Sequence, residues 1–431
     1  MPSFDDENEK VIFGLTITFQ KSFEVIANGV LNRKTPIGDA ISWQYNMQKP
    51  MSSYLLVIDI GNFQKKSDKA LSGIPLEYYY EKEDINRVEP TYRNSNLIFD
   101  FFEKEIGVAY PWKIYRQIPV RDFLYAGMEN TTTTLFSRDF VEDSIGYNDR
   151  NYLNINAHEL AHHWFGNLVT AQSGKDHWLQ EGFATYYALL AEREVFGDNY
   201  FYKKFYDISR QVKQASKKDS IPILNKKASS LSLYQKGGLA LFVLRDNLGR
   251  EKFNLAVKNY LKKYSFKNVT TDDFLKEINL ISTFDTKAFK ENWLEKTLFP
   301  QEEVNRLFQK NEFIQQYSKL SSKPLDLIKD HDEVLRIMQS DAYFSIKELI
   351  VYQAAPKPFE EKAFLMSAAL ATHDLNVRQA VASSMHSIPE SFRLEYESLL
   401  QDKSYATQEI ALFNLWKQFP EHQKRYLDLA K

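Results

Sequence analysis

Two histidines and a glutamate within one short segment have residue types and a spacing suited to binding a metal ion. His158 and His162 begin and end the run HELAH, at positions i and i+4. On an α-helix such positions share a face and lie about 5–6 Å apart, so both imidazoles can bind one ion. Four of the chain's eight histidines lie in this segment. We interpret the other two, His163 and His177, as structural residues and not as ligands.

Glu181 is the best candidate for a third ligand. Eighteen residues separate it from His162, enough to end one helix, turn and enter an antiparallel second helix. Two histidines and one glutamate are a recognised ligand set of catalytic zinc, which leaves a fourth position for water. Glu159 lies about 100° round the helix from His158, so it can reach such a water without joining the ligands. Asp176 is expected to be the N-cap of the second helix.

A chance pattern on a packed helix is the alternative to a metal site. Five residues of the form H-E-x-x-H arise by accident in helices, and the pattern alone does not decide the matter. The chain contains no cysteine, so it has neither disulfides nor thiolate ligands, and any metal must be bound by His, Asp or Glu. The glutamate at helix-hairpin spacing favours the metal site.

Composition describes a globular protein and excludes several classes of partner. The 431 residues correspond to about three domains, and 43% hydrophobic with 26% charged residues is typical of a packed core. A net charge of −2 gives no basic excess for nucleic acid or an anionic membrane. There is no apolar run long enough to cross a membrane. The first ten residues, MPSFDDENEK, lack the basic and apolar segments of a signal peptide. The location stays undecided between cytoplasmic and exported.

The pattern of residues predicts a β-rich beginning followed by helices. Asn28-Gly29 is a hairpin-turn signal, and Gly197 and Gly249 are expected at helix ends. Strands are predicted over 11–19, 53–60 and 74–80 and in the strand-like stretch 110–135; helices are predicted over 88–106, 149–168, 176–196 and 237–249.

Pro300 and the charged residues after it indicate a domain boundary, beyond which the chain is helical. Ile388-Pro-Glu recurs as Phe419-Pro-Glu, and Tyr396 recurs as Tyr426. A period near thirty residues is typical of stacked helix pairs in a solenoid, although ordinary helix packing gives the same pattern. We therefore predict an α+β multidomain protein with domains at 1–68, 69–300 and 301–431.

Two further motifs flank the histidine segment. Glu129 lies in the run AGMEN, in strand-like sequence, where burial of its carboxylate is costly without a cationic partner. Downstream, Tyr234 precedes Lys236-Gly237 at the start of a predicted helix. Either residue could also be an ordinary member of the core.

Taken together, these motifs resemble the aminopeptidase N family of zinc metallopeptidases. The family pattern is G-x-M-E-N, then H-E-x-x-H, a glutamate eighteen residues on, and a tyrosine before Lys-Gly. The resemblance covers most of residues 1–300 and includes the flanking runs WFGNLVT after His163 and EGFA from Glu181. It implies a β-sandwich-like N-terminal domain of which 1–68 is the last part, a thermolysin-like catalytic domain with a small sheet, and a HEAT- or armadillo-like helical region.

The resemblance also implies a role for each motif residue. His158, His162 and Glu181 would bind one zinc ion, and Glu159 would be the general base that activates a zinc-bound water. Tyr234 would donate to the oxyanion, and Glu129 would pair with the free α-ammonium group of a peptide. Gly127, Met128 and Asn130 would line the strand edge along which the substrate docks. The expected activity is removal of N-terminal residues from peptides.

Several departures from the family pattern accompany this resemblance. Ala126, His163 and Gln180 replace a common glycine, glutamine and asparagine, and none of these removes a catalytic group. Pro2-Ser-Phe-Asp5 resembles an interior stretch of the N-terminal domain, so we expect a fragment that lacks a further residue for the substrate amine and part of the C-terminus. A catalytically silent peptide-binding module or inactive fragment, a zinc endopeptidase without need of Glu129, and an epoxide hydrolase are the alternatives.

Overall fold

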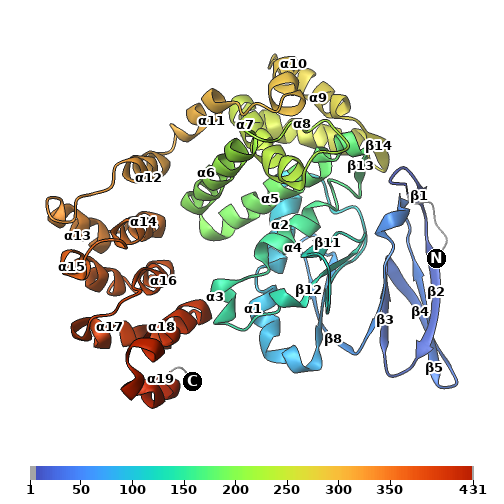
Figure 1. Ribbon diagram of the computed structural model, residues 1–431. Coiled ribbons are helices and arrows are strands. Elements are labelled where there is room, and N and C mark those ends of the chain that lie inside the picture. The colour runs from blue at the N-terminus through green and yellow to red at the C-terminus, as the bar shows by residue number, and fades with distance from the viewer. Residues whose placement is uncertain (1–5, 430–431) are drawn as a thin grey trace. The chain divides into compact units, whose positions relative to one another are not determined.

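The computed structural model describes residues 6–429, which form two compact units (Figure 1). The first unit comprises the chain up to Val141 together with Tyr152–Phe308, and the second comprises Glu142–Asn151 and the chain from Gln309 onward. Strands come first and helices dominate the rest, which confirms the expected mixed α+β class in its coarse form. Among residues 6–429, no helix combines the length and apolar character needed to cross a membrane.

The β-rich beginning consists of small antiparallel sheets. Inward-facing Val25, Ala27, Trp43 and Tyr45 are buried between them and form one hydrophobic cluster. The pairs are β1 (Lys10–Val11) with β6 (Met51–Ser52), β3 (Glu24–Ala27) with β7 (Ile58–Gly61), and β2 (Gly14–Gln20) with β5 (Ala40–Asn46) and then β4 (Val30–Ile37).

Asn28-Gly29 is not the turn of a hairpin, because β3 and β4 belong to different sheets. The Asn28 side chain donates to the carbonyls of Leu55 and Thr131 and accepts from the Val57 N–H. Gly29 has φ +84°, a conformation that glycine adopts without strain. The pair therefore forms a corner at which the chain passes from one sheet to the next.

The same asparagine explains why the predicted strand over 53–60 is only partly formed. Ser53–Leu55 is a 3₁₀ turn, and only the end of the segment pairs as a strand, in β7. Because the Asn28 amide satisfies the backbone of Leu55 and Val57, these residues need no neighbouring strand.

A five-stranded sheet in the order β11-β12-β10-β9-β8 follows. Its three central strands run parallel, and the edge strands β8 and β11 are antiparallel to their neighbours. The predicted strand over 74–80 is confirmed as β9. The strands are β8 (Phe63–Lys69), β9 (Pro75–Glu81), β10 (Tyr115–Val120), β11 (Gly127–Met128) and β12 (Thr133–Ser137).

Helices of the first unit pack around α5 (Trp178–Phe196), which is buried along most of its length. It contacts α2, α4, α6 and α7, and Gly197 ends it as expected. The predicted helix over 88–106 is divided into two helices, α1 and α2. The helix predicted over 237–249 is confirmed and ends at Leu248. The other helices are α1 (Val88–Tyr92), α2 (Ser95–Ile106), α4 (Leu153–Ala161), α6 (Asp198–Ala215), α7 (Gly237–Leu248), α8 (Arg250–Lys263), α9 (Thr271–Asn279), α10 (Thr286–Phe289) and α11 (Gln301–Phe308), with a short parallel pair of β13 (Val169–Ala171) and β14 (Lys267–Val269).

The predicted helix over 149–168 is shorter, since α4 begins at Leu153 and ends at Ala161. Trp164, Phe165 and Leu168 are buried and continue the apolar pattern, so hydrophobicity gave no sign of the helix end. The chain instead turns back through Gly166, whose φ is +141°.

Asp176 is not the N-cap of α5. Its carboxylate accepts hydrogen bonds from the backbone N–H and the hydroxyl of Thr271, both at 2.9 Å. Thr271 is the first residue of α9, so Asp176 caps a helix that lies far away in the sequence.

The second unit is helical. Helices α12, α14, α16 and α18 contact one another in succession, and α13 contacts α15. Tyr396 and Tyr426 are both buried, and each follows a short 3₁₀ turn after a proline, so the recurring sequence corresponds to recurring local structure. The helices are α3 (Gly146–Asp149), α12 (Glu312–Ser322), α13 (His331–Gln339), α14 (Phe344–Ala354), α15 (Phe359–Leu370), α16 (Leu375–Ser384), α17 (Arg393–Glu397), α18 (Tyr405–Gln418) and α19 (Gln423–Leu429).

The Asn28 corner yields a stability prediction. Asn28→Ala leaves the Thr131 carbonyl and the Val57 N–H buried without partners and removes one of the two donors to the Leu55 carbonyl. We expect it to lower the free energy of unfolding by about 3 kcal/mol. Urea unfolding followed by circular dichroism measures the change. Asn46→Ala, at an exposed position of β5, is the matched control and should stay within about 0.5 kcal/mol of the parent chain. Equal stability of the two variants would contradict the role of this corner.

Candidate metal centre

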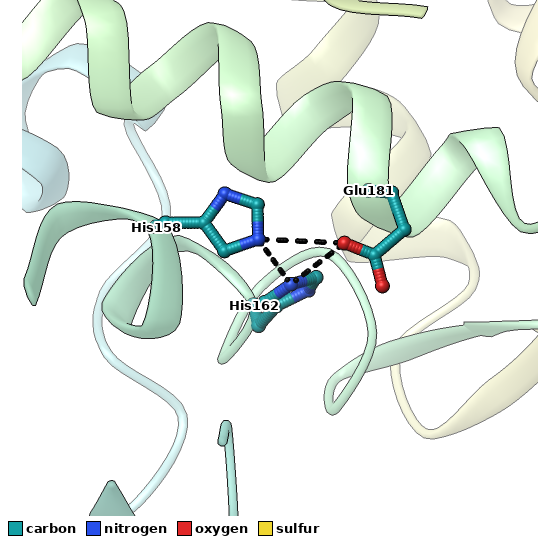
Figure 2. Close-up of side chains that lie close together, drawn as sticks. All are labelled: His158, His162 and Glu181. Atoms are coloured by element: carbon teal, nitrogen blue, oxygen red, sulfur yellow. Dashed lines mark hydrogen bonds and ion pairs between the residues drawn. The ribbon is translucent and has the colours of Figure 1, made fainter. Parts of the chain in front are cut away.

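Three predicted ligands converge between α4 and α5 (Figure 2). His158 lies in the last turn of α4, His162 follows its end, and Glu181 lies in the first turn of α5. Glu181 Oε2 is 3.4 Å from His158 Nε2 and 3.3 Å from His162 Nε2. The two Nε2 atoms are 3.0 Å apart.

These separations fit a tetrahedral zinc ion. Zinc–ligand bonds of about 2.0–2.2 Å place neighbouring ligands about 3.3 Å apart at the corners of a tetrahedron. Glu181 Oε2 is buried and faces both imidazoles. The geometry and the donor set therefore fit one zinc ion, with His158, His162 and Glu181 as its ligands and one corner left open.

The orientation of His162 also suits a ligand. Its Nδ1 lies 3.0 Å from the backbone carbonyl of Phe165. An N–H at Nδ1 donates to that oxygen and leaves the Nε2 lone pair directed at the other two ligands. The turn that ends α4 thus fixes the imidazole through the chain's own backbone.

Charge attraction acts between the side chains of the site. Burial opposes protonation of His162, but the carboxylates of Glu181 and Glu129 outweigh it and raise the pKa of His162 to about 10. Burial alone would raise the pKa of the Glu181 carboxyl, and the two imidazoles instead hold it well below its usual range. The attraction between His162 and Glu181 therefore offsets part of the cost of burying the carboxylate.

Glu159 lies beside the three ligands but outside their group. Burial raises the pKa of Glu159 well above its usual value, and Glu129 and Glu181 add to this effect. Gly127 of β11 approaches it closely: a Cβ at this position would lie 2.4 Å from Glu159 Oε1. Only glycine lets the edge strand reach the carboxylate.

Glu129 follows Met128 at the end of β11. The Tyr54 hydroxyl donates to Glu129 Oε1 at 3.3 Å, and the Asn167 amide donates to the Glu129 carbonyl at 2.8 Å. Within residues 6–429, no Lys or Arg forms an ion pair with this carboxylate. Tyr54 comes from the β-rich part and carried no sequence signal, whereas Asn167 lies in the run WFGNLVT.

A tight turn after Glu129 connects β11 to β12 and is fixed by His163. Thr132 has a positive φ of 69°, and its N–H donates to His163 Nε2 at 3.0 Å. His163 Nδ1 lies 3.1 Å from the Glu159 carbonyl, to which it donates. Burial lowers the pKa of His163 to about 3, so the ring is neutral and can both donate and accept. His163 thus ties the turn to α4 and does not point at the ligands, as its structural interpretation requires.

Asn130 begins this turn and is buried. Its amide donates to the Leu55 carbonyl at 3.2 Å, and its own carbonyl accepts from the Thr133 N–H. The side chain therefore fastens β11 to the β-rich part. Its Oδ1 atom is buried without a partner.

Tyr234 lies in a π-helical turn (Leu231–Lys236) before α7. Its ring stacks on His158, with centroids 5.5 Å apart and planes 4° from parallel. Burial and the carboxylate of Glu181 raise the pKa of Tyr234 well above its usual value, so the hydroxyl keeps its proton and is a hydrogen-bond donor. The structure thus brings this predicted residue to the ligands.

A cavity of about 590 Å³ opens beside Glu129 and Glu181. His177, interpreted from sequence as structural, lines it and lies 2.6 Å from Glu7 Oε1. Gln180 also lines the cavity, and its Oε1 accepts from the Ala171 N–H. Glu7 and Tyr54 line this cavity, and sequence reasoning singled out neither.

A second group of carboxylates, Glu81, Glu83 and Asp84, lies at the end of β9. Arg121 and Arg138 form ion pairs with all three. These guanidinium groups neutralise the three carboxylates. The carboxylates are therefore a weaker candidate for a cation site than His158, His162 and Glu181.

Comparison with known proteins relates the central part of the chain to a family of peptidases. Residues 91–293 match the family described as "Peptidase family M1 domain". Glutamyl aminopeptidase of Bos taurus is 28% identical over 319 residues, covering 69% of this chain and 33% of that protein. Leucyl aminopeptidase of Saccharolobus solfataricus is 29% identical over 322 residues, covering 71% and 40%. The chain therefore spans well under half the length of these relatives.

Solved structures share the fold. The M1 zinc metallopeptidase of Deinococcus radiodurans aligns with a TM-score of 0.58 at 20% identity, over 70% of this chain and 67% of that one. A mutant of that protein was crystallised bound to the substrate Tyr-Ser-Ala, and it aligns with the same TM-score. At this level of identity the likeness concerns the fold.

The ligand geometry yields a metal-binding prediction. We expect the purified chain to contain one zinc per molecule and the His162→Ala variant to contain almost none. At free zinc of about 100 times Kd, bound metal stabilises the fold by about 2.7 kcal/mol, so a chelator should lower the Tm. Elemental analysis and thermal unfolding measure the two effects. His331→Ala, at an exposed position of α13, is the control; equal zinc in both variants would contradict the assignment.

Proposed function

The chain belongs to the M1 family of peptidases, and from this premise we propose that it is a zinc-dependent aminopeptidase that hydrolyses the first peptide bond of peptides with a free N-terminus. One observation carries the proposal. The carboxylate of Glu129, which forms no ion pair with any Lys or Arg among residues 6–429, lies in the same cavity as the ligand Glu181. A substrate α-ammonium group would supply the missing charge.

The roles of the remaining residues follow from their positions. Glu159 takes the proton of the attacking water and passes it to the leaving amine; its raised pKa suits a group that alternately accepts and donates. Tyr234 donates to the oxyanion of the tetrahedral intermediate. When bound by His158, His162 and Glu181, zinc supplies Lewis-acid polarisation of the reacting carbonyl and of water.

The edge strand β11 suits docking of a peptide backbone. Gly127 and Met128 pair with β12 on one side only, since β11 ends the five-stranded sheet. An extended peptide can add to such an edge by main-chain hydrogen bonds. Asn130, which follows β11, anchors this strand to the β-rich part through the Leu55 carbonyl. The docked peptide would then place its first residue next to Glu129.

We also propose the finer architecture. The part of the first unit that follows the β-rich beginning is thermolysin-like, the β-rich beginning is sandwich-like, and the second unit is a solenoid of helix pairs. Successive contacts of alternate helices α12, α14, α16 and α18 favour the solenoid. As domain limits we retain 1–68, 69–300 and 301–431, although α11 packs on α6 and α7 and β8 pairs with β9.

A silent peptide-binding module is the alternative, and turnover separates it from an enzyme. We expect hydrolysis of aminoacyl-anilides with a free amine and none of their N-acetylated forms. Glu159→Gln should lower kcat by about a thousandfold with zinc content unchanged, because only proton transfer is lost. Turnover and elemental analysis measure both quantities. Zinc without turnover in the parent chain would favour the module, and equal cleavage of acetylated substrates would favour an endopeptidase.

A second prediction concerns Glu129. Glu129→Gln keeps an acceptor for Tyr54 but removes the charge that pairs with the substrate amine. We expect kcat/KM for free-amine substrates to fall about a hundredfold, which corresponds to about 2.7 kcal/mol for a desolvated charge pair. Steady-state kinetics measure the ratio. A variant with unchanged kcat/KM would show that the amine binds elsewhere.

A further inference from the structure

The cavity beside the metal centre is strongly acidic. Four carboxylates line it, from Asp6, Glu7, Glu129 and Glu181, and none of the described residues that line it is Lys or Arg. His177 is its one lining group that can carry positive charge. A cavity of about 590 Å³ lies within the range that accepts a long side chain.

The proposed reaction leaves Glu7 without a role. Glu181 is assigned to zinc and Glu129 to the substrate α-ammonium, while Asp6 is exposed and accepts from the Asn8 N–H and amide. One oxygen of Glu7 accepts from His177, and the other, Oε2, is buried without any hydrogen-bond partner. A buried carboxylate oxygen in this state is costly unless a donor arrives with a ligand.

Hydrogen bonds from two distant segments fix the backbone of Glu7. Its backbone carbonyl accepts from the Ser52 hydroxyl at 3.0 Å and from the Asn268 amide at 3.3 Å. Lys10, the cation closest along the chain, donates to Ser52 and Thr170 and forms no hydrogen bond with Glu7, although the charge of Glu7 opposes the lowering of the Lys10 pKa by burial. These contacts therefore hold Glu7 in place at the wall of the cavity.

We propose that this cavity receives the side chain of the substrate's first residue and selects a positively charged one, lysine or arginine, with Glu7 as the specificity-determining residue. The proposal rests on the proposed aminopeptidase function. With the α-ammonium on Glu129, the side chain of the first residue extends into the same cavity toward Glu7. A lysine or arginine donor satisfies Oε2, whereas a glutamate side chain would add a carboxylate to an acidic cavity with no Lys or Arg to pair with it.

Kinetics with matched substrates test the proposal. Lysyl- and norleucyl-anilides differ chiefly by the terminal ammonium, and glutamyl-anilide carries the opposite charge. We expect the zinc-loaded chain to favour the lysyl over the norleucyl substrate about tenfold in kcat/KM and to cleave the glutamyl substrate most slowly. Glu7→Gln keeps the acceptor for His177 and removes the charge, so it should lower kcat/KM for the lysyl substrate about tenfold, to the norleucyl value.

Glu9→Gln is the control, because Glu9 is exposed on the same segment and does not line the cavity. It should keep the parent preference. Equal kcat/KM for lysyl and norleucyl substrates in the parent chain, or an equal loss on both in Glu7→Gln, would overturn the role of Glu7 while leaving the aminopeptidase function intact.

Binding of free amino acids separates failure of this inference from failure of the proposed function. By calorimetry, the zinc-loaded chain should bind L-lysine about tenfold more tightly than L-norleucine, and Glu7→Gln should bind both alike. If no anilide is hydrolysed, the proposed function fails, and this affinity ratio still decides the charge selectivity of the cavity. Equal affinities in the parent chain overturn the inference.

Discussion

The packing of α4 against α5 brings one buried carboxylate onto two imidazoles, and the site depends on this contact. A carboxylate in such a place is tolerated only when positive charge lies next to it, whether from protonated His162 or from a bound zinc ion. α5 holds Glu181 rigidly because it is buried against four neighbouring helices. The hydrophobic core therefore sets the positions of His158 and Glu181, and the turn after α4 sets that of His162.

Around this contact, a few polar side chains determine how the edge strand β11 meets α4. Gly127 packs on the Glu159 carboxylate, and His163 joins the Glu159 carbonyl to the turn after Glu129. The Asn28 amide, in the β-rich part, donates a hydrogen bond to the Thr131 carbonyl of the same turn. Each link is a buried hydrogen bond or a close approach, so displacement of the strand would leave several polar groups unsatisfied. The three clustered side chains His158, His162 and Glu181 thus belong to one rigid group with Glu159 and Glu129.

Sequence reasoning was wrong where a side chain replaced an expected backbone partner. The Asn-Gly pair has the composition of a hairpin turn, yet Asn28 bonds to residues as far as 103 positions away. Asp176 has the type and place of an N-cap for α5, yet it caps α9, 95 residues on. Local patterns report the local preference of a residue, and a distant backbone group can satisfy that preference equally well.

The sequence by itself determined the metal ligands, the neighbouring Glu159 and the order of strands before helices. His158 and His162 follow from the 3.6-residue period of the helix, and Glu181 from the length of a helix hairpin, both of which are short-range constraints. Only the tertiary structure decided which side chains surround Glu129 and line the cavity beside it. Tyr54 lies 75 residues from Glu129, and Glu7 lies 170 residues from His177. Contacts of such separation leave no periodicity in the sequence, because they arise when the β-rich part folds against the helices.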